Sequence, residues 1–356
     1  MRTIAQRMIH RVIIDEFFRL GEDLPLADVR TPAEFEQGHV PGAFNLPLFT
    51  NEERVVVGTT YKQTGREAAI LLGFDLTGPR WSGFIKEALM RSPDKKMAVH
   101  CWRGGMRSEA MAWALNLYGF EVYLIKGGYK SFRRWALHQF SLPYPLMILG
   151  GMTGCGKTKV LHELRSLGEQ VTDLEDLAQH RGSTYGTMNS LVQPTQEQFE
   201  NNLATQLLKL DPARRVWIEN ESSCIGKRII PRPIWNQMLL APLIDMTMPV
   251  EQRIENLANE YGQLDKSFLV ACTERIGKRL GPLQTKQAIE AIYENRMTDF
   301  VRLATVYYDK TYRSCLLKRN PDQVVSVAIN GNDHKLIANR ILCVAHSWLQ
   351  ETVQHV

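Results

Sequence analysis

Two short glycine-bearing segments of this 356-residue chain carry residue types that can do chemistry. The first, Gly151–Thr158, reads GMTGCGKT and lies between the apolar run Leu146–Gly150 and a helical pattern over Lys159–Leu167. This is the GxxxxGK[ST] pattern of a phosphate-binding loop, in the strand–loop–helix context that the pattern requires. Its glycines let successive backbone N–H groups point at one phosphate, and the helix N-terminus adds a favourable dipole.

The loop therefore predicts a phosphate or diphosphate site. Its members are Gly151, Met152, Thr153, Gly154, Cys155, Gly156, Lys157 and Thr158. Lys157 can reach the outer phosphate oxygens, and the Thr158 hydroxyl can hold a magnesium ion. Two acids, Asp173 and Glu219, are candidates to orient such an ion, with an ordinary buried or solvated acid as the equal alternative. The pattern recognises phosphates and not the group attached to them, so a nucleotide and another diphosphate both stay open.

The second segment reads CWRGGMRS from Cys101 to Ser108, after the apolar run Met97–His100 and before a helical pattern over Glu109–Tyr118. A thiol there faces backbone N–H groups and the positive end of a helix, which favour the nucleophilic thiolate. We predict Cys101 as a catalytic nucleophile, with a small core cysteine as the alternative. The residues predicted to hold an anionic donor are Arg103, Gly104, Gly105, Arg107 and Ser108.

The composition narrows the class of protein. With 44% hydrophobic and 23% charged residues, the chain is typical of a globular protein. Its first residues lack the continuous apolar stretch of a signal peptide or a membrane span, so the cytoplasm and no membrane partner are expected. The six cysteines form no CxxC pair, so neither a zinc knuckle nor a dithiol redox motif is expected. No prosthetic group is expected either. A net charge of +5 permits a nucleic-acid partner without requiring one.

Short apolar runs alternate with helical patterns along the whole chain. The predicted strands are Pro25–Val29, Met97–His100, Val122–Ile125, Leu146–Gly150, Val216–Glu219 and Leu243–Met248. This alternation predicts an α/β fold with parallel sheets in both halves and a helical C-terminal part. Pro143 and Pro145 disfavour helix just before a new strand, so we expect domains at 1–140 and 141–356.

The first domain resembles the rhodanese family of sulfurtransferases over most of residues 15–135. The resemblance is carried by Asp28-Val29-Arg30, Glu34-Phe35, Gly38–Ala43 and Asn45 before the cysteine, and by Gly119-Phe120, Val122, Leu124 and Gly127-Gly128-Tyr129 after it. It implies a rhodanese-like fold and a persulfide-type intermediate, with a chalcogen carried on Cys101. The Cys101–Arg107 spacing is one residue longer than is usual for the family's single-turnover sulfur carriers. It matches the loop of cysteine phosphatases, which suits a phosphate-bearing donor.

The two segments together make the chain similar to the tRNA 2-selenouridine synthase family, with a rhodanese-like domain followed by a P-loop NTPase-like domain. Further strings with that resemblance are Asp173-Leu174-Glu175, His180-Arg181-Gly182-Ser183 and Trp217–Ser222. The resemblance implies a transferase that replaces sulfur by selenium in 2-thiouridine at the wobble position of tRNA. It also implies selenophosphate and geranyl diphosphate as co-substrates, with S-geranyl-2-thiouridine as an intermediate. The P-loop would hold a diphosphate, either that of geranyl diphosphate or that of a nucleotide.

Three alternatives stay open. A P-loop kinase with a regulatory or sulfur-carrying rhodanese module would depend on Lys157 and ignore Cys101. A cysteine phosphatase would need a general-acid Asp near the thiol, for which Asp28 is a poor candidate. The third is a tRNA-binding scaffold without activity. Residues that could stack on or pair with a tRNA are Trp102, Tyr185, Tyr307, Tyr308 and Arg313, although each residue type is more often in a core or on a surface. Arg253, Arg275, Lys278, Arg279, Arg296 and Arg302 could close over a phosphate or contact RNA, with a solvated helix face as the default.

Overall fold

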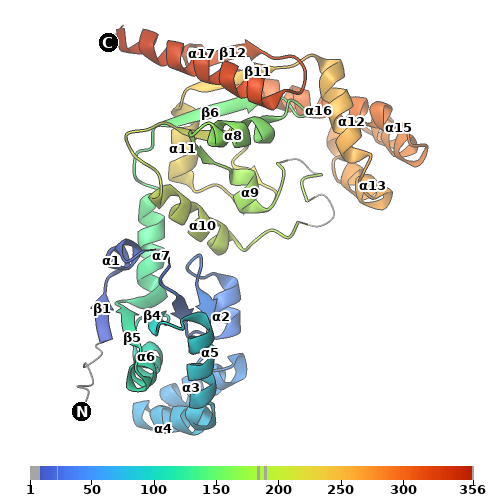
Figure 1. Cartoon of the computed structure of the whole chain (residues 1–356). Helices are drawn as coiled ribbons and strands as arrows, with labels where there is room; N and C mark the ends of the chain where they lie inside the picture. The colour runs from blue at the N-terminus through green and yellow to red at the C-terminus, as the bar shows by residue number, and fades with distance from the viewer. Residues whose placement is uncertain (1–8, 22, 183–184, 188–190, 355–356) are drawn as a thin grey trace. The chain divides into compact units, whose positions relative to one another are not determined.

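The computed structural model describes residues 9–21, 23–182, 185–187 and 191–354, and Ser183 from the sequence analysis lies outside them (Figure 1). The chain divides into two compact units. One comprises Met1–Gln139 with Glu200–Thr205, and the other comprises Phe140–Phe199 with Gln206–Val356. Among the described residues, no helix has the length and apolar character needed to cross a bilayer.

The first unit is built on a parallel sheet of five strands. In spatial order these are β1 (Ile9–Val12), β5 (Glu121–Ile125), β4 (Lys96–His100), β2 (Leu26–Asp28) and β3 (Phe44–Asn45). Met97 and Val99 of β4 pack on one face against α5 (Trp81–Arg91) and α6 (Met106–Tyr118). Because side chains alternate along a strand, His100 points to the other face, where its ring stacks on Tyr129. That face carries α1 (Ile14–Arg19) and α7 (Gly128–Gln139), which pack on each other.

Three helices and one turn complete the first unit. They are α2 (Pro32–Gln37), α3 (Asn51–Gln63), α4 (Arg66–Thr77) and the 3-10 turn Gly78–Arg80. Sequence signals explain where two of them begin. Thr31 and Thr50 each accept a hydrogen bond from the backbone three residues on, and a glutamate there returns the bond to the capping residue.

The second unit also has a parallel five-stranded sheet, in the order β12 (Val324–Ala328), β11 (Leu243–Thr247), β6 (Leu146–Gly151), β8 (Val216–Glu219) and β7 (Gln170–Thr172). The helices α8 (Lys157–Ser166) and α17 (His334–Gln354) pack together against it (Figure 1). A small antiparallel pair joins β9 (Cys224–Ile225) and β10 (Arg228–Ile229). The remaining elements around the sheet are α9 (Leu174–Ala178), α10 (Gln196–Leu208), α11 (Arg232–Leu240) and the 3-10 turn Pro321–Gln323.

A group of helices between β11 and β12 has its own apolar core. Its members are α12 (Val250–Tyr261), α13 (Lys266–Arg275), α14 (Gly277–Leu280), α15 (Pro282–Tyr293) and α16 (Met297–Leu316). Tyr185, Tyr261 and Phe300 lie at the centre of that core.

The predicted α/β class with parallel sheets and a helical C-terminal part is confirmed, and all six predicted strands are present. The strands β1, β3, β7, β9, β10 and β12 were missed. Both chemically promising loops leave the carboxyl end of an interior strand, β4 in one unit and β6 in the other. This is where open parallel sheets place their ligands.

Candidate functional site

Cys101 lies where β4 ends, and its residue is only 4% exposed. The Ser108 hydroxyl, in the first turn of α6, lies 3.2 Å from Cys101 Sγ and 3.0 Å from the Gly105 carbonyl oxygen. Ser108 can therefore donate a hydrogen bond to a thiolate at Cys101. The sequence predicted N–H groups and positive charge around this thiol, whereas the structure also places the Gly105 carbonyl oxygen 3.8 Å from Sγ.

The segment after β5 forms the other wall of the cysteine loop. The backbone N–H groups of Tyr129 and Lys130 donate to the carbonyl oxygens of Cys101 and Trp102. Gly128 has φ +57°, and a Cβ there would lie 2.2 Å from the Cys101 carbonyl oxygen. Gly104, with φ +67°, faces the same segment, since its Cβ would lie 2.9 Å from the Gly127 nitrogen. Only glycine fits this approach, so the Gly127-Gly128 string fixes the shape of the cysteine loop.

The two arginines of this loop have different surroundings. Arg103 is exposed. Arg107 forms an ion pair with Glu34, with nitrogen–oxygen distances of 2.7 and 3.3 Å. Burial alone would raise the pKa of Glu34, but hydrogen bonding to and the charge of Arg107 hold it below its usual value. An anionic donor that binds Arg107 must therefore compete with the Glu34 carboxylate, a partner that the sequence reading did not foresee.

A buried ionic group lies beside His100, the residue before Cys101. Asp28 and Arg30 are both fully buried, 2.6 Å apart at their closest atoms, and the Arg30 guanidinium lies 3.8 Å from the Tyr129 ring centroid. Burial favours neutral Asp28, but His100 and Arg30 lower the pKa of its carboxyl below the usual value. An ionised, fully buried carboxylate is a poor proton donor, so Asp28 does not supply the general acid that a cysteine phosphatase needs.

In the second unit, the predicted P-loop connects β6 to α8. Lys157 opens α8, and its Nζ donates to the Gly151 carbonyl oxygen at 2.8 Å. Burial alone would lower the pKa of Lys157, yet Cys155 and three glutamates raise it above its usual value. The Cys155 thiol is buried, which raises its pKa, so this residue offers its backbone and not its sulfur.

The acidic residues gather beside Thr158. Its hydroxyl donates to Glu175 at 3.0 Å, and the Glu175 N–H donates to Glu219 at 2.7 Å. The other carboxylate oxygen of Glu219 is buried and has no hydrogen-bond partner among the described residues. Burial, with Asp173 and Glu175 nearby, raises the pKa of Glu219 well above the usual value. Burial also raises the pKa of Glu221, to about 8.

Asp173 has a mainly structural environment. One oxygen caps α9 by accepting from the Asp176 N–H at 2.8 Å, and the other lies 2.8 Å from His162 Nε2. Glu175, which the sequence analysis named only within the Asp173-Leu174-Glu175 string, is the acid that contacts Thr158. The described part of the chain contains no group of three or more His, Cys, Asp or Glu side chains arranged to hold a metal ion.

Side chains from the helical group form hydrogen bonds with the backbone of the P-loop. Arg253 of α12 donates to the Thr153 carbonyl oxygen at 3.1 Å and pairs with Asp309 of α16 at 2.6 Å. Tyr312 of α16 accepts from the Gly151 N–H at 2.6 Å and donates to Asp245. Arg253 is only 2% exposed, so it belongs neither to a solvated face nor to an RNA surface. No sequence signal near the loop identifies these partners.

The P-loop opens into a cavity of about 1630 Å³. One wall carries Lys157, Thr158 and the glutamates, and another carries Tyr307, Tyr312 and Lys318 from α16 and the residues just after it. Trp235, Leu239 and Leu257 add apolar surface. This volume exceeds what a phosphate group needs, so the cavity has room for the body of a larger phosphorylated ligand.

Comparison with known proteins gives the same two-part organisation. The model of the rhodanese-like domain family matches residues 15–134, and the model of the tRNA 2-selenouridine synthase AAA domain matches residues 144–339. The chain belongs to the tRNA 2-selenouridine synthase family. The resemblance drawn from the sequence is confirmed at this level.

Curated members of the family are similar over different lengths. The tRNA 2-selenouridine synthase of Nitrosomonas europaea is 39% identical over 251 residues, which cover 67% of this chain and 64% of that protein. That of Sulfurovum sp. is 35% identical over 340 residues, which cover 88% of this chain and 91% of that protein. A solved tRNA isopentenylpyrophosphate transferase from Bacillus halodurans matches 60% of this chain at 14% identity and a TM-score of 0.34, which is too weak to bear on function.

Proposed function

We propose that this protein is a tRNA-modifying transferase that replaces sulfur by selenium in wobble 2-thiouridine, with selenophosphate as the selenium donor. One observation supports this most strongly. This chain of the family has two separate loops that we predict to bind anions, one with the thiol of Cys101 and one with Lys157 and Thr158. Two loops of different chemistry suit two different anionic co-substrates.

The P-loop is proposed to hold the diphosphate of geranyl diphosphate. Sulfur of 2-thiouridine would attack the first carbon of the geranyl group. A sulfur–carbon bond would form, the carbon–oxygen bond to diphosphate would break, and the N3 proton of the base would pass to solvent. Lys157 and the loop N–H groups stabilise charge on the departing diphosphate. The apolar surface of Trp235, Leu239 and Leu257 in the same cavity suits the hydrocarbon chain. If a magnesium ion accompanies the diphosphate, the Thr158 hydroxyl and the Glu175 carboxylate would supply protein oxygens for it, and the diphosphate would supply others.

Cys101 is proposed to release selenium from selenophosphate. Transfer of selenium itself to the thiolate would leave phosphorus two electrons more reduced, as phosphite, and would leave an oxidised sulfur–selenium pair on the protein. Attack on phosphorus needs no redox partner. A sulfur–phosphorus bond forms, the phosphorus–selenium bond breaks, selenide leaves, and water later hydrolyses the phosphocysteine. Selenide is a far better leaving group than an alkoxide, so this step needs no general acid, in keeping with the ionised state of Asp28.

The released selenide would then attack C2 of the S-geranylated uridine. Its carbon–selenium bond forms as the bond to the geranyl thiolate breaks, which leaves 2-selenouridine. S-geranylation makes this exchange feasible, because a thiolate leaves more readily than the sulfur of a thiocarbonyl.

The test is nucleoside mass spectrometry on tRNA that carries 2-thiouridine, with the two co-substrates added separately and together. We expect S-geranyl-2-thiouridine with geranyl diphosphate alone and 2-selenouridine with both. Unchanged tRNA under every condition, together with nucleoside triphosphate hydrolysis that depends on Lys157, would refute the proposal and favour the P-loop kinase.

A further inference from the structure

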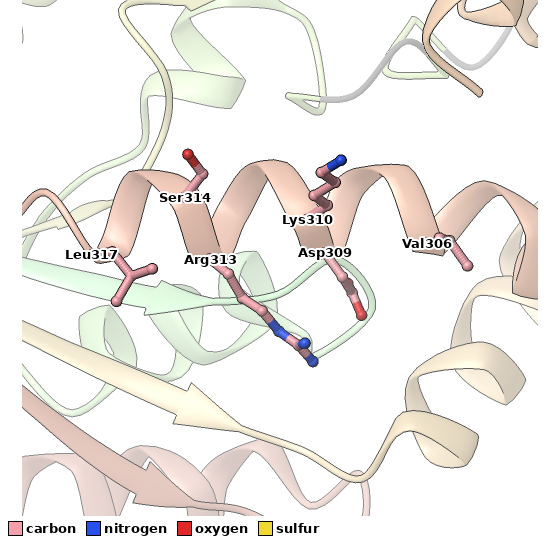
Figure 2. A pocket seen from close by; sticks show the side chains of 6 residues that line it. All are labelled: Val306, Asp309, Lys310, Arg313, Ser314 and Leu317. Atoms are coloured by element: carbon pink, nitrogen blue, oxygen red, sulfur yellow. The ribbon is translucent and has the colours of Figure 1, made fainter. Parts of the chain in front are cut away.

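Helix α16 has an exposed face with several positive charges. A shallow groove of about 650 Å³ runs along it, lined by Val306, Asp309, Lys310, Arg313, Ser314 and Leu317. Figure 2 shows Lys310 and Ser314 pointing to one side of the helix and Asp309 and Arg313 to the other. These positions are three or four residues apart, so they are neighbours on the helix surface.

The positive charge of this face comes from three side chains. Lys310, Arg313 and the following Lys318 are exposed, and among the described residues none of them has an ion-pair partner. Asp309 is the one acid in the lining of the groove, and its charge is matched by Arg253 at 2.6 Å. The face therefore keeps an uncompensated positive charge, which suits a polyanion.

Aromatic side chains lie beside these charges. The rings of Tyr307 and Tyr308 are 5.2 Å apart, and the Arg279 guanidinium donates to the Tyr307 hydroxyl at 2.8 Å. Tyr307 and Lys318 also line the P-loop cavity. Aromatic surface next to unpaired cations is the combination that binds single-stranded nucleic acid, because bases stack on the rings and phosphates meet the cations.

We infer that the α16 face, defined by Tyr307, Lys310, Arg313 and Lys318, binds a single-stranded RNA segment of the substrate and leads one nucleotide towards the P-loop cavity. This inference rests on the proposed tRNA-modifying function. The backbone phosphates contact Lys310 and Arg313, which line the same groove, and Lys318, which lines the P-loop cavity. A base stacks on Tyr307 at the rim of the cavity. RNA is favoured over an acidic protein because the rings lie next to the cations and open into the P-loop cavity.

The test compares two double variants by fluorescence anisotropy with a labelled tRNA over a range of salt concentrations. One variant changes α16 itself, and the other changes its N-cap residue and its second turn. K310A/R313A removes two unpaired cations, whereas R296A/R302A removes two arginines that are held by Glu294, Asp299 and Glu251. Both variants lose the same charge. We expect K310A/R313A to weaken binding about tenfold or more at low salt and to flatten the salt slope by about 1.4, from about 0.7 per lost phosphate contact. The control should change much less.

The aromatic contact is tested separately. We expect Tyr307→Ala to weaken tRNA binding about tenfold through lost stacking, whereas Tyr307→Phe keeps the ring and should stay close to the wild type. Thermal unfolding confirms that each variant is folded. Equal affinities and salt slopes for the two double variants would overturn the inference and would assign the face to another partner. If those variants bind tRNA equally while the wild type still forms 2-selenouridine, the α16 inference fails and the proposed function stands. If the wild type modifies no tRNA, the proposed function fails.

Discussion

The cysteine loop and the P-loop have the same position in their sheets, but different contacts hold them in place. Each leaves an interior parallel strand and opens a helix. The cysteine loop is shaped by nearby glycines and held by Glu34 through Arg107. The P-loop is instead fastened by Arg253 and Tyr312, roughly a hundred or more residues further along the chain.

The two loops therefore differ in what determines their geometry: glycines close to the loop in one case, and contacts with distant helices in the other. The geometry of the cysteine loop is determined within the rhodanese-like unit, which has its own signature strings. The position of the Cys101 thiol therefore depends on contacts inside that unit. The geometry of the P-loop depends on the helical group, so phosphate binding there is tied to the packing of α12 and α16. Damage to that helical packing should therefore reach the P-loop and leave the cysteine loop unaffected.

The largest expected effect separates the two loops chemically. In Cys101→Ala, formation of 2-selenouridine should fall to the uncatalysed background, while S-geranyl-2-thiouridine should still form. Cys224→Ala, at an exposed cysteine, is the matched control and should keep both activities. Nucleoside mass spectrometry measures both products. Equal loss of both steps in Cys101→Ala would show that the loops do not have separate roles.

The reciprocal variant removes the P-loop cation. Lys157→Ala should slow geranylation by about 100- to 1000-fold, because one preorganised donor to the departing diphosphate is lost. Supplied with tRNA that is already S-geranylated, this variant should form 2-selenouridine at the wild-type rate. A large loss with that substrate would contradict the division.

The contact between the P-loop and the helical group can be tested by measuring the free energy of unfolding. Arg253→Ala leaves Asp309 without its ion-pair partner and should lower the free energy of unfolding by about 3 kcal/mol. Arg302→Ala breaks an exposed pair with Glu251 and should cost less than about 1 kcal/mol. Denaturant unfolding gives both values. Similar costs for the two variants would mean that the P-loop does not depend on the buried pair.

The smallest effect concerns the cysteine loop. Glu34→Gln should cost about 1 kcal/mol at pH 7, since the pair with Arg107 is partly exposed and screened by solvent. The lowered pKa of Glu34 means that its stabilisation is complete above the usual value of 4.5 and is lost as the pH falls through the folded value. The difference between the wild type and Glu34→Gln should therefore shrink below pH 4.5. A difference that grows in acid would show that Arg107 does not stabilise ionised Glu34.

The sequence predicted what depends on local pattern. Apolar runs in buried strands revealed β4, β6, β8 and β11, and spacing revealed both loops. The missed strand β1, with sequence IHRV, lies at a sheet edge where His10 and Arg11 interrupt the apolar pattern. Contacts between residues far apart in the chain were also missed. Glu34 belonged to a recognised string, yet its ion pair with Arg107 spans 73 positions, and nothing near Tyr312 marked it as a partner of Gly151.

The close approach of Gly104 and Gly128 has a consequence for mutational scanning. A side chain at either position would lie within 3 Å of backbone atoms of the facing segment. Backbone cannot move aside as a flexible side chain can, so every substitution at these two positions should displace the thiol beside them. A library selected only for folding should tolerate some of these changes, whereas one selected for selenium incorporation should return glycine at both positions.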